Sequence, residues 1–249
     1  DLCDRKVTTL TWAVSALTLV SSLKGLAYRV PEYVNKVMFS GEAMPPKQLR
    51  IWQDALPDAE FVNLYGPTEI TCNCTFYRVK RRYDDKEKIP AGRAFPGRVV
   101  FLLGEDGQQI TAPGQQGEIC VAGESLAEGY YRNPEQTAQR FVLYPVNGNE
   151  KTRIYKTGDM GCFDENGELV FAGRKDFQIK HMGHRIELEE IESAMNSVDN
   201  IQKSCCIFDR DRNRIVGFYM GDVEPSEVRR TLKEKLPLYM VAPRLVQMN

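Results

Sequence analysis

The first quarter of the chain alternates between strand-like and helix-like patterns. Short β-branched or apolar runs are separated by segments whose apolar residues recur at helical spacing. The expected elements are a strand at 7–12, a helix at 15–23, a strand at 36–39, a helix at 46–56 and a strand at 60–63. Consecutive strands joined by helices form a parallel sheet, which binds ligands at the carboxyl ends of its strands. The segments that follow the second and third strands are therefore predicted to hold ligand-binding residues.

Two further regions follow. From residue 75 to 172, short strands alternate with glycine-containing turns, which predicts a β-rich region. Its expected strands lie at 99–103, 117–122, 162–164 and 169–171. Beyond Gly173, a helix is predicted where apolar residues recur at helical spacing from Leu188 to Val198, followed by strands at 203–208 and 215–220 and a helix at 225–236. The predicted fold is an α/β region (1–75), a β-rich subdomain (76–173) and a small α+β domain (174–249).

Composition excludes several classes of function. The 33 basic and 34 acidic residues give a net charge of -1, so there is no electrostatic footprint for nucleic acid. The charge-free stretch 7–23 contains Thr and Ser and is shorter than the ~20 apolar residues of a membrane span. The cysteine spacing suits free thiols in a reducing compartment, and a zinc site could add only His181 and His184 as ligands. With no signal-peptide pattern at its start, we expect a cytoplasmic protein without membrane insertion.

Three polar motifs are candidates for a nucleotide site: Asn63-Leu-Tyr-Gly-Pro-Thr-Glu-Ile70, Tyr155-Lys-Thr-Gly-Asp159 and the run from Gly173 to Glu192. Binding of Mg-ATP needs an apolar or aromatic slot for adenine, a carboxylate for the ribose hydroxyls and a metal ligand. Tyr65, Asp159 and Glu69 are residues of these types. Each motif alone also fits a turn or solvated surface charges. We expect the last two motifs to lie outside the core, and their occurrence together favours a site.

In sequence order and spacing, these motifs resemble those of adenylate-forming enzymes, which activate a carboxylate with ATP and pass it to a thiol. The resemblance is strongest to amino-acid adenylation domains, especially D-alanine ligases that load a carrier protein. It implies a partial adenylate-forming enzyme fold: the end of the large α/β subdomain at 1–75, the β-rich subdomain at 76–173 and a mobile, incomplete C-terminal domain at 174–249. The implied cofactors are ATP and Mg²⁺. The implied partners are a small carboxylate or amino acid and a carrier protein with a phosphopantetheine arm.

The resemblance also implies roles for individual residues. Those expected to contact the nucleotide, its magnesium ion or the substrate are Tyr65 on adenine, Asn63 at the adenine amino edge, Thr68 near the α-phosphate, Glu69 on magnesium, Asp159 and Arg174 at the ribose, and Gly41 and Glu42 beside adenine and substrate. Those expected to serve the thioester-forming step are Lys180, Gly183 and Arg185, with Asp176 as the hinge of the mobile domain.

The chain also departs from the pattern of this family. It has neither a Ser/Thr/Gly-rich phosphate loop ending in Pro-Lys-Gly nor the Asn-Gly-Lys stretch that carries the adenylation lysine. We therefore expect a fragment, about half of an enzyme, that is inactive alone. Ser40 stands where D-alanine ligases usually have cysteine, which is a further departure. D-alanine stays the first choice of substrate on the overall resemblance, and another small amino acid is the second. The alternatives are an acyl-CoA ligase and, from a different class, a non-catalytic nucleotide-binding or interaction module.

Overall fold

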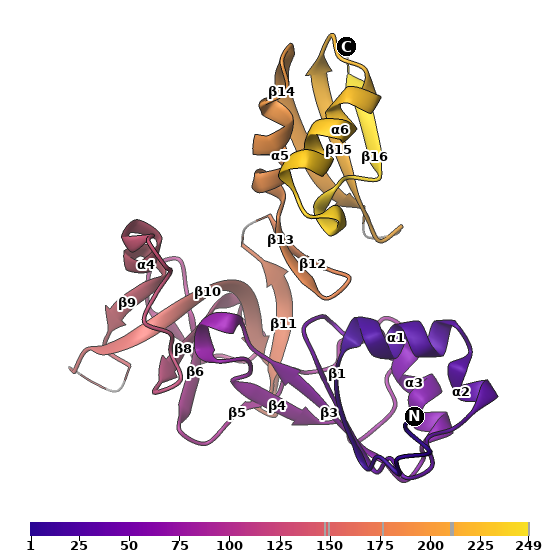
Figure 1. Cartoon of the computed structure of the whole chain (residues 1–249). Helices are drawn as coiled ribbons and strands as arrows, with labels where there is room; N and C mark the ends of the chain where they lie inside the picture. The colour runs from indigo at the N-terminus through magenta and orange to yellow at the C-terminus, as the bar shows by residue number, and fades with distance from the viewer. Residues whose placement is uncertain (147, 149, 176, 210–211, 249) are drawn as a thin grey trace. The chain divides into compact units, whose positions relative to one another are not determined.

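A computed structural model describes residues 1–146, 148, 150–175, 177–209 and 212–248. The chain divides into two compact units, Asp1–Lys175 and Asp176–Asn249, and each is described by itself (Figure 1). The predicted domain boundaries at 75 and 173 stay predictions. Hydrogen bonds of the first sheet continue past residue 75 as far as Ala94.

The first sheet has the order β1-β2-β3-β4-β5. Strands β1 (Thr9–Ala13), β2 (Lys36–Ser40) and β3 (Glu60–Tyr65) are parallel, as the sequence predicts. Strands β4 (Thr75–Arg78) and β5 (Arg93–Ala94), which were not predicted, extend the sheet in antiparallel pairing. Helices α1 (Val14–Ser22), α2 (Gly25–Tyr28) and α3 (Pro46–Ala55) pack beside the parallel strands.

A single apolar core joins these helices to the parallel strands. Phe39 of β2, Leu17 of α1 and Trp52 of α3 are all at most 1% exposed. The indole nitrogen of Trp52 donates a hydrogen bond to the Leu17 carbonyl at 3.0 Å, so the one polar atom of this large side chain is satisfied inside the core. The core thereby fixes the positions of the carboxyl ends of β2 and β3.

The second sheet has the order β11-β10-β8-β6-β7, with β9 also paired to β10. Its strands are β6 (Arg98–Leu103), β7 (Gln109–Ile110), β8 (Gly117–Gly123), β9 (Phe141–Tyr144), the long β10 (Thr152–Phe163) and β11 (Leu169–Arg174). The predicted hairpin is confirmed, because Cys162 pairs with Val170 across the turn. Helix α4 (Pro134–Arg140) was not predicted; it begins where the side chain of Asn133 accepts a hydrogen bond from the Gln136 amide at 3.0 Å.

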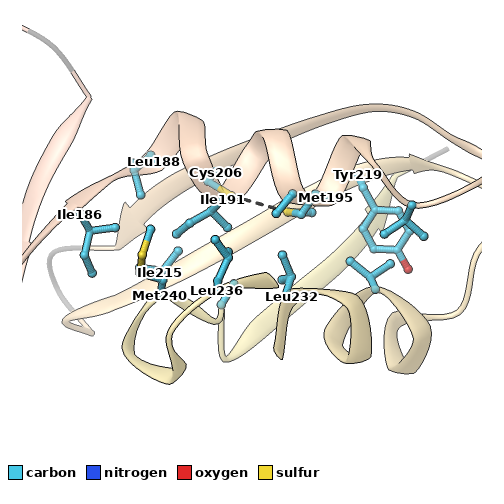
Figure 2. Packing of buried hydrophobic residues seen from close by; sticks show 14 of the residues in the cluster. Ile186, Leu188, Ile191, Met195, Cys206, Ile215, Tyr219, Leu232, Leu236 and Met240 are labelled. Atoms are coloured by element: carbon cyan, nitrogen blue, oxygen red, sulfur yellow. Dashed lines mark hydrogen bonds between the residues drawn. The ribbon is translucent and has the colours of Figure 1, made fainter. Parts of the chain in front are cut away.

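The second unit begins with a hairpin of β12 (Gln178–His181) and β13 (His184–Glu187), followed by α5 (Leu188–Asn196), β14 (Ile201–Asp209), β15 (Arg214–Gly221), α6 (Pro225–Lys235) and β16 (Arg244–Met248). Strands β14 and β15 and both helices confirm the sequence prediction, whereas the hairpin and β16 were not predicted. Figure 2 shows side chains of α5, β15 and the α6 segment meeting in one apolar cluster. Within this cluster, the thiol of Cys206 contacts the sulfur of Met195 at 3.7 Å.

Within the described residues, none of the helices is both long enough and apolar enough to cross a membrane.

Candidate nucleotide site

The parallel strands bring two of the predicted loops to the same edge of the first sheet. Gly41 and Glu42 follow the carboxyl end of β2, while Tyr65 ends β3 and leads into the single 3₁₀ turn η1 (Thr68–Ile70). Gly41 has a φ of 95°, a conformation that glycine adopts without strain. The parallel order of these strands is confirmed, and the ligand-binding role of the loops that follow them stays a prediction.

The turn after β3 is tightly folded. A Cβ atom on Gly66 would lie 2.6 Å from the Cα atom of Asn73, so no other residue fits there without a backbone shift. Thr71 and Cys72 follow η1 with φ values of 58° and 78°, in the left-handed region that ordinary residues rarely adopt. Strained backbone of this kind persists only where surrounding contacts hold it. Here the hydroxyl of Thr71 donates a hydrogen bond to the Ser125 carbonyl at 2.8 Å.

Tyr65, Asp159 and Arg174 come together from three strands. The Tyr65 hydroxyl donates a hydrogen bond to Oδ2 of Asp159 at 2.6 Å, and a guanidinium nitrogen of Arg174 donates to Oδ1. The second terminal nitrogen of Arg174 lies 3.3 Å from the Thr157 carbonyl. Three residues that the sequence assigned to one nucleotide site are therefore in direct contact.

A bulge in β10 sets the direction of the Asp159 side chain. The register between β10 and β8 shifts between Lys156 and Met160, and the Thr157 hydroxyl closes the bulge by donating to the Ile119 carbonyl at 2.8 Å. The same hydroxyl accepts from the Asp159 amide at 2.9 Å. On the other side, Asp159 pairs with Arg174 in the register of β10 and β11. The carboxylate is thus held by backbone geometry as well as by its side-chain partners.

The Tyr155–Asp159 motif is buried, which corrects the expectation that it lies outside the core. Tyr155 and Thr157 are each 1% exposed and Asp159 is 3% exposed. The reason is that β10 is a central strand, with β8 on one side and β11 on the other. The buried side chains of Tyr155, Thr157 and Asp159 therefore find hydrogen-bond partners inside the protein, on neighbouring strands and loops.

The charge of Asp159 and the burial of the hydroxyl both act on Tyr65, whose side chain as a whole is half-buried. Burial first, and then the neighbouring Asp159 carboxylate, raises the pKa of the Tyr65 hydroxyl well above its usual range. The hydroxyl is consequently protonated at any physiological pH and acts as a hydrogen-bond donor to Asp159.

Glu69 lies in η1 with 6% of its surface exposed. The hydroxyl of Tyr130 donates a hydrogen bond to Oε1 of Glu69 at 2.7 Å. Within the described residues, no group of three or more His, Cys, Asp or Glu side chains could hold a metal ion. A single carboxylate is nevertheless enough for Mg²⁺, which usually binds through one or two carboxylates together with substrate phosphates and water. Glu69 therefore fits the predicted role.

Two other residues of the predicted nucleotide site, Asn63 and Thr68, lie close to Tyr65 and Glu69 in the sequence. The side-chain amide of Asn63 donates a hydrogen bond to the Pro90 carbonyl at 2.8 Å, which joins β3 to the segment before β5. Thr68 is exposed at the start of η1. The structure thus places Asn63, Tyr65, Thr68 and Glu69 within seven consecutive positions, from the end of β3 through η1.

The residues assigned to the thioester-forming step lie in the second unit, on the hairpin β12–β13. Lys180 and Arg185 are paired across the hairpin, so both cationic side chains emerge on the same face. Met182 and Gly183 form its two-residue turn with φ values of 52° and 80°, which is the pattern of a type I′ turn. Asp176, the predicted hinge, lies outside the described residues.

Sequence reasoning gave no role to Tyr130, Glu118 or Thr157, although all three lie in segments that resemble the family. Glu118 accepts a hydrogen bond from the Gly158 amide at 3.1 Å and lies 3.7 Å from the Lys156 ammonium. A tyrosine next to a glycine at 129–130 was the one available signal for Tyr130, because its contact with Glu69 spans 61 residues of sequence.

The sequence of this chain is similar to those of known proteins. Residues 1–131 match the family model described as AMP-binding enzyme. The chain belongs to the AMP-binding enzyme family. Among curated relatives, surfactin synthase subunit 1 of Bacillus subtilis (strain 168) is 34% identical over 221 residues, which make up 87% of this chain and 6% of the relative. The family resemblance inferred from the motifs is thereby confirmed.

Solved structures show the same fold. The structure of IdnL1 superposes with a TM-score of 0.87 at 31% identity and covers 99% of this chain and 51% of its own. That of holo-PA1221, an NRPS protein containing adenylation and PCP domains, gives a TM-score of 0.86 at 28% identity, covering 99% of this chain and 42% of its own. The adenylate-forming fold is thus confirmed. The chain spans about half the length of these solved chains and a small part of the curated relative.

Proposed function

We propose that this chain contributes to ATP-dependent activation of a small amino acid and its transfer to the phosphopantetheine thiol of a carrier protein. In the first step a substrate carboxylate oxygen attacks the α-phosphorus of ATP, an acyl-adenylate forms and pyrophosphate leaves. In the second step the thiol sulfur attacks the acyl carbon and AMP leaves. Membership of the AMP-binding enzyme family supports the first step.

The observation that carries the proposal is the contact of Tyr65 and Arg174 with Asp159. Each oxygen of the carboxylate accepts one hydrogen bond in this group. An ionised carboxylate offers about four lone-pair sites, so acceptor capacity remains for two ribose hydroxyls. Tyr65 then presents its ring to adenine while its hydroxyl anchors the ribose-binding carboxylate.

Glu69 and Thr68 serve the phosphate end of the nucleotide in this proposal. Mg²⁺ held by Glu69 would neutralise charge on the phosphate oxygens. Thr68 is exposed in the same turn, and its hydroxyl can donate to a phosphate oxygen. Gly41 and Glu42 line the adenine and substrate side from the neighbouring strand end.

The hairpin β12–β13 supports the second step. Lys180 and Arg185 place positive charge on one face of the hairpin, which suits a phosphate-bearing arm. Gly183 at the tip allows close approach of that arm, and Asp176 is the hinge of a mobile domain of residues 174–249. The relative PA1221 contains both adenylation and PCP domains, which favours a carrier over free coenzyme A as acceptor.

D-alanine is the proposed first substrate, and another small amino acid the second.

The cysteines also bear on the compartment. Within the described residues, all seven are free thiols: Cys3, Cys72, Cys74, Cys120, Cys162, Cys205 and Cys206. Free thiols suit a reducing compartment, which supports the proposed cytoplasmic location.

Transfer of a labelled amino acid tests the proposal. The full-length protein is incubated with ATP, Mg²⁺ and labelled D-alanine or glycine, in parallel with a phosphopantetheinylated carrier and with coenzyme A. We expect label on the carrier thiol only. Label on coenzyme A would favour the acyl-CoA ligase, whereas nucleotide binding without transfer to either thiol would favour the non-catalytic module.

A further inference from the structure

The segment 125–130 makes three hydrogen bonds to η1 and to the residue that follows it. The Ser125 carbonyl accepts from the Thr71 hydroxyl at 2.8 Å, and the Ala127 amide donates to the Glu69 carbonyl at 2.8 Å. The Tyr130 hydroxyl then donates to the Glu69 carboxylate at 2.7 Å. Both the backbone and the side chain of Glu69 are therefore held by one segment that is distant in sequence.

Helix α4 fixes the backbone of Tyr130. The Tyr130 amide donates to the Thr137 hydroxyl at 2.9 Å, and that hydroxyl in turn donates to the Asn133 carbonyl at 2.8 Å. Gly129 is required beside them, since a Cβ atom there would lie 2.5 Å from a methyl carbon of Thr137. The Tyr130 ring packs edge-on against Phe141, with 5.8 Å between centroids. These contacts restrict where the Tyr130 hydroxyl can lie.

A second tyrosine supports this hydroxyl from inside the sheet. The hydroxyls of Tyr155 and Tyr130 are 3.1 Å apart. A phenol has one proton, and Tyr130 gives its proton to Glu69, so Tyr155 is the donor within the tyrosine pair. The order of donation is Tyr155 to Tyr130 to Glu69.

We propose that Tyr130 is a positioning residue for Glu69, fixing the carboxylate in the orientation that binds the magnesium ion of Mg-ATP, and that Tyr155 acts through Tyr130. The inference rests on the proposed function, because it assigns a partner to the proposed metal ligand. Removal of a side chain that orients a metal ligand typically lowers metal affinity or activity by about 10- to 100-fold. Neither tyrosine need touch the nucleotide to have this effect.

The test is the magnesium dependence of ATP binding and of amino-acid-dependent pyrophosphate exchange, both measured on the full-length protein. A variant that misplaces Glu69 should need more Mg²⁺ in both measurements. Tyr130→Phe keeps the ring against Phe141 and removes only the hydroxyl. We expect it to raise the Mg²⁺ concentration for half-maximal exchange about 10-fold, at saturating ATP and amino acid. Tyr155→Phe should give a smaller rise. The double variant should match Tyr130→Phe alone, since the effects of residues acting through one another are not additive.

Tyr144→Phe is the matched control. It also removes a single tyrosine hydroxyl, one in β9 that donates to the Gly107 carbonyl at 3.0 Å, and it should leave the magnesium dependence unchanged. An unchanged magnesium requirement in Tyr130→Phe, or the same rise in Tyr144→Phe, would overturn this inference and leave the proposed function standing. If the wild-type protein binds ATP equally well with and without Mg²⁺, the magnesium role of Glu69 fails, and the inference fails with it.

Discussion

Arg174 and Asp159 form an ion pair across β10 and β11 with side-chain exposures of 12% and 4%. Because both charges are largely removed from water, loss of either partner leaves the other without compensation. The pair therefore has two consequences, one for stability and one for nucleotide binding.

Replacement of Asp159 should affect both properties. Asp159→Asn keeps the shape of the side chain but removes the charge that pairs with Arg174. We expect the free energy of unfolding to decrease by about 3–5 kcal/mol, as for other broken buried pairs. The apparent dissociation constant for ATP should rise at least about tenfold, since charge-assisted hydrogen bonds to the ribose are typically worth about 1.5–3 kcal/mol. Asp159→Ala should be worse in both respects.

Asp54→Asn is the control for this experiment. Asp54 pairs with Arg82 at 2.5 Å, but the two side chains are 62% and 59% exposed. An exposed pair contributes about 0–1 kcal/mol, so neither stability nor ATP affinity should change appreciably. If a folded Asp159→Asn variant retains wild-type affinity for ATP, the ribose role of Asp159 is wrong.

Tyr65 has a ring and a hydroxyl with separable tasks. Tyr65→Phe removes the donor to Asp159 while Arg174 stays in place, so we expect a loss of about 1 kcal/mol of stability and at most a few-fold change in ATP affinity. Tyr65→Ala also removes the surface for adenine and should weaken ATP binding by about tenfold or more. Titration of both variants with nucleotide distinguishes the tasks. Equal ATP affinity in Tyr65→Ala and the wild type would contradict the stacking role.

Buried thiols should make the protein sensitive to alkaline pH. Burial raises the pKa of Cys120 to about 12, and likewise that of Cys74 and of Cys206. In the unfolded chain a thiol ionises near pH ~8.5, so above this pH the folded state binds more protons than the unfolded state. Stability is therefore fully present below that pH and decreases as the pH rises toward 12, by about 1.4 kcal/mol per pH unit for each thiol.

Denaturant unfolding between pH ~8.5 and ~12 checks this expectation. Cys120→Ala should show a shallower decrease than the wild type, even though its stability at neutral pH is lower because a cavity is created. An identical slope in the two proteins would show that the buried thiol makes no such contribution.

Gly183 tests the role of the hairpin β12–β13 in the second step. Gly183 has a φ of 80° in the turn, so any large side chain both strains the turn and fills the space at its tip. Gly183→Asn is the matched control, because asparagine tolerates the left-handed region. In the full-length protein, we expect Gly183→Leu to keep pyrophosphate exchange and lose carrier loading, while Gly183→Asn keeps exchange and more of the carrier loading.

The two half-reactions and the melting temperature are measured for each variant. Parallel loss of exchange and loading in Gly183→Leu, together with a lower melting temperature, would mean that the glycine serves only the turn.

The sequence predicted elements whose patterns are local. Strands β1–β3, β14 and β15 and helices α1, α3, α5 and α6 follow from apolar spacing. Helix α4 escaped prediction because none of its residues is buried, so it has no apolar stripe; only its Asn-Pro start gave a signal. The hairpin β12–β13 was missed because its turn, Met182-Gly183, lacks the usual Asn-Gly or Asp-Gly sequence.

The candidate site was predictable only in part. The motif resemblance assigned Tyr65, Asp159 and Arg174 to one nucleotide site, and these three side chains are in contact. The burial of Tyr155 was not predictable from its polar neighbours, since it depends on β10 lying between β8 and β11. The contact of Tyr130 with Glu69 depends likewise on the packing of segments that are far apart in sequence.

The central claim is that the site around Asp159 activates an amino acid with ATP. Amino-acid-dependent exchange of labelled pyrophosphate into ATP by the full-length protein tests it most directly. The account predicts exchange with D-alanine or another small amino acid, abolished when Mg²⁺ is removed. Exchange driven only by fatty acids, or none with any carboxylate while ATP still binds, would contradict it.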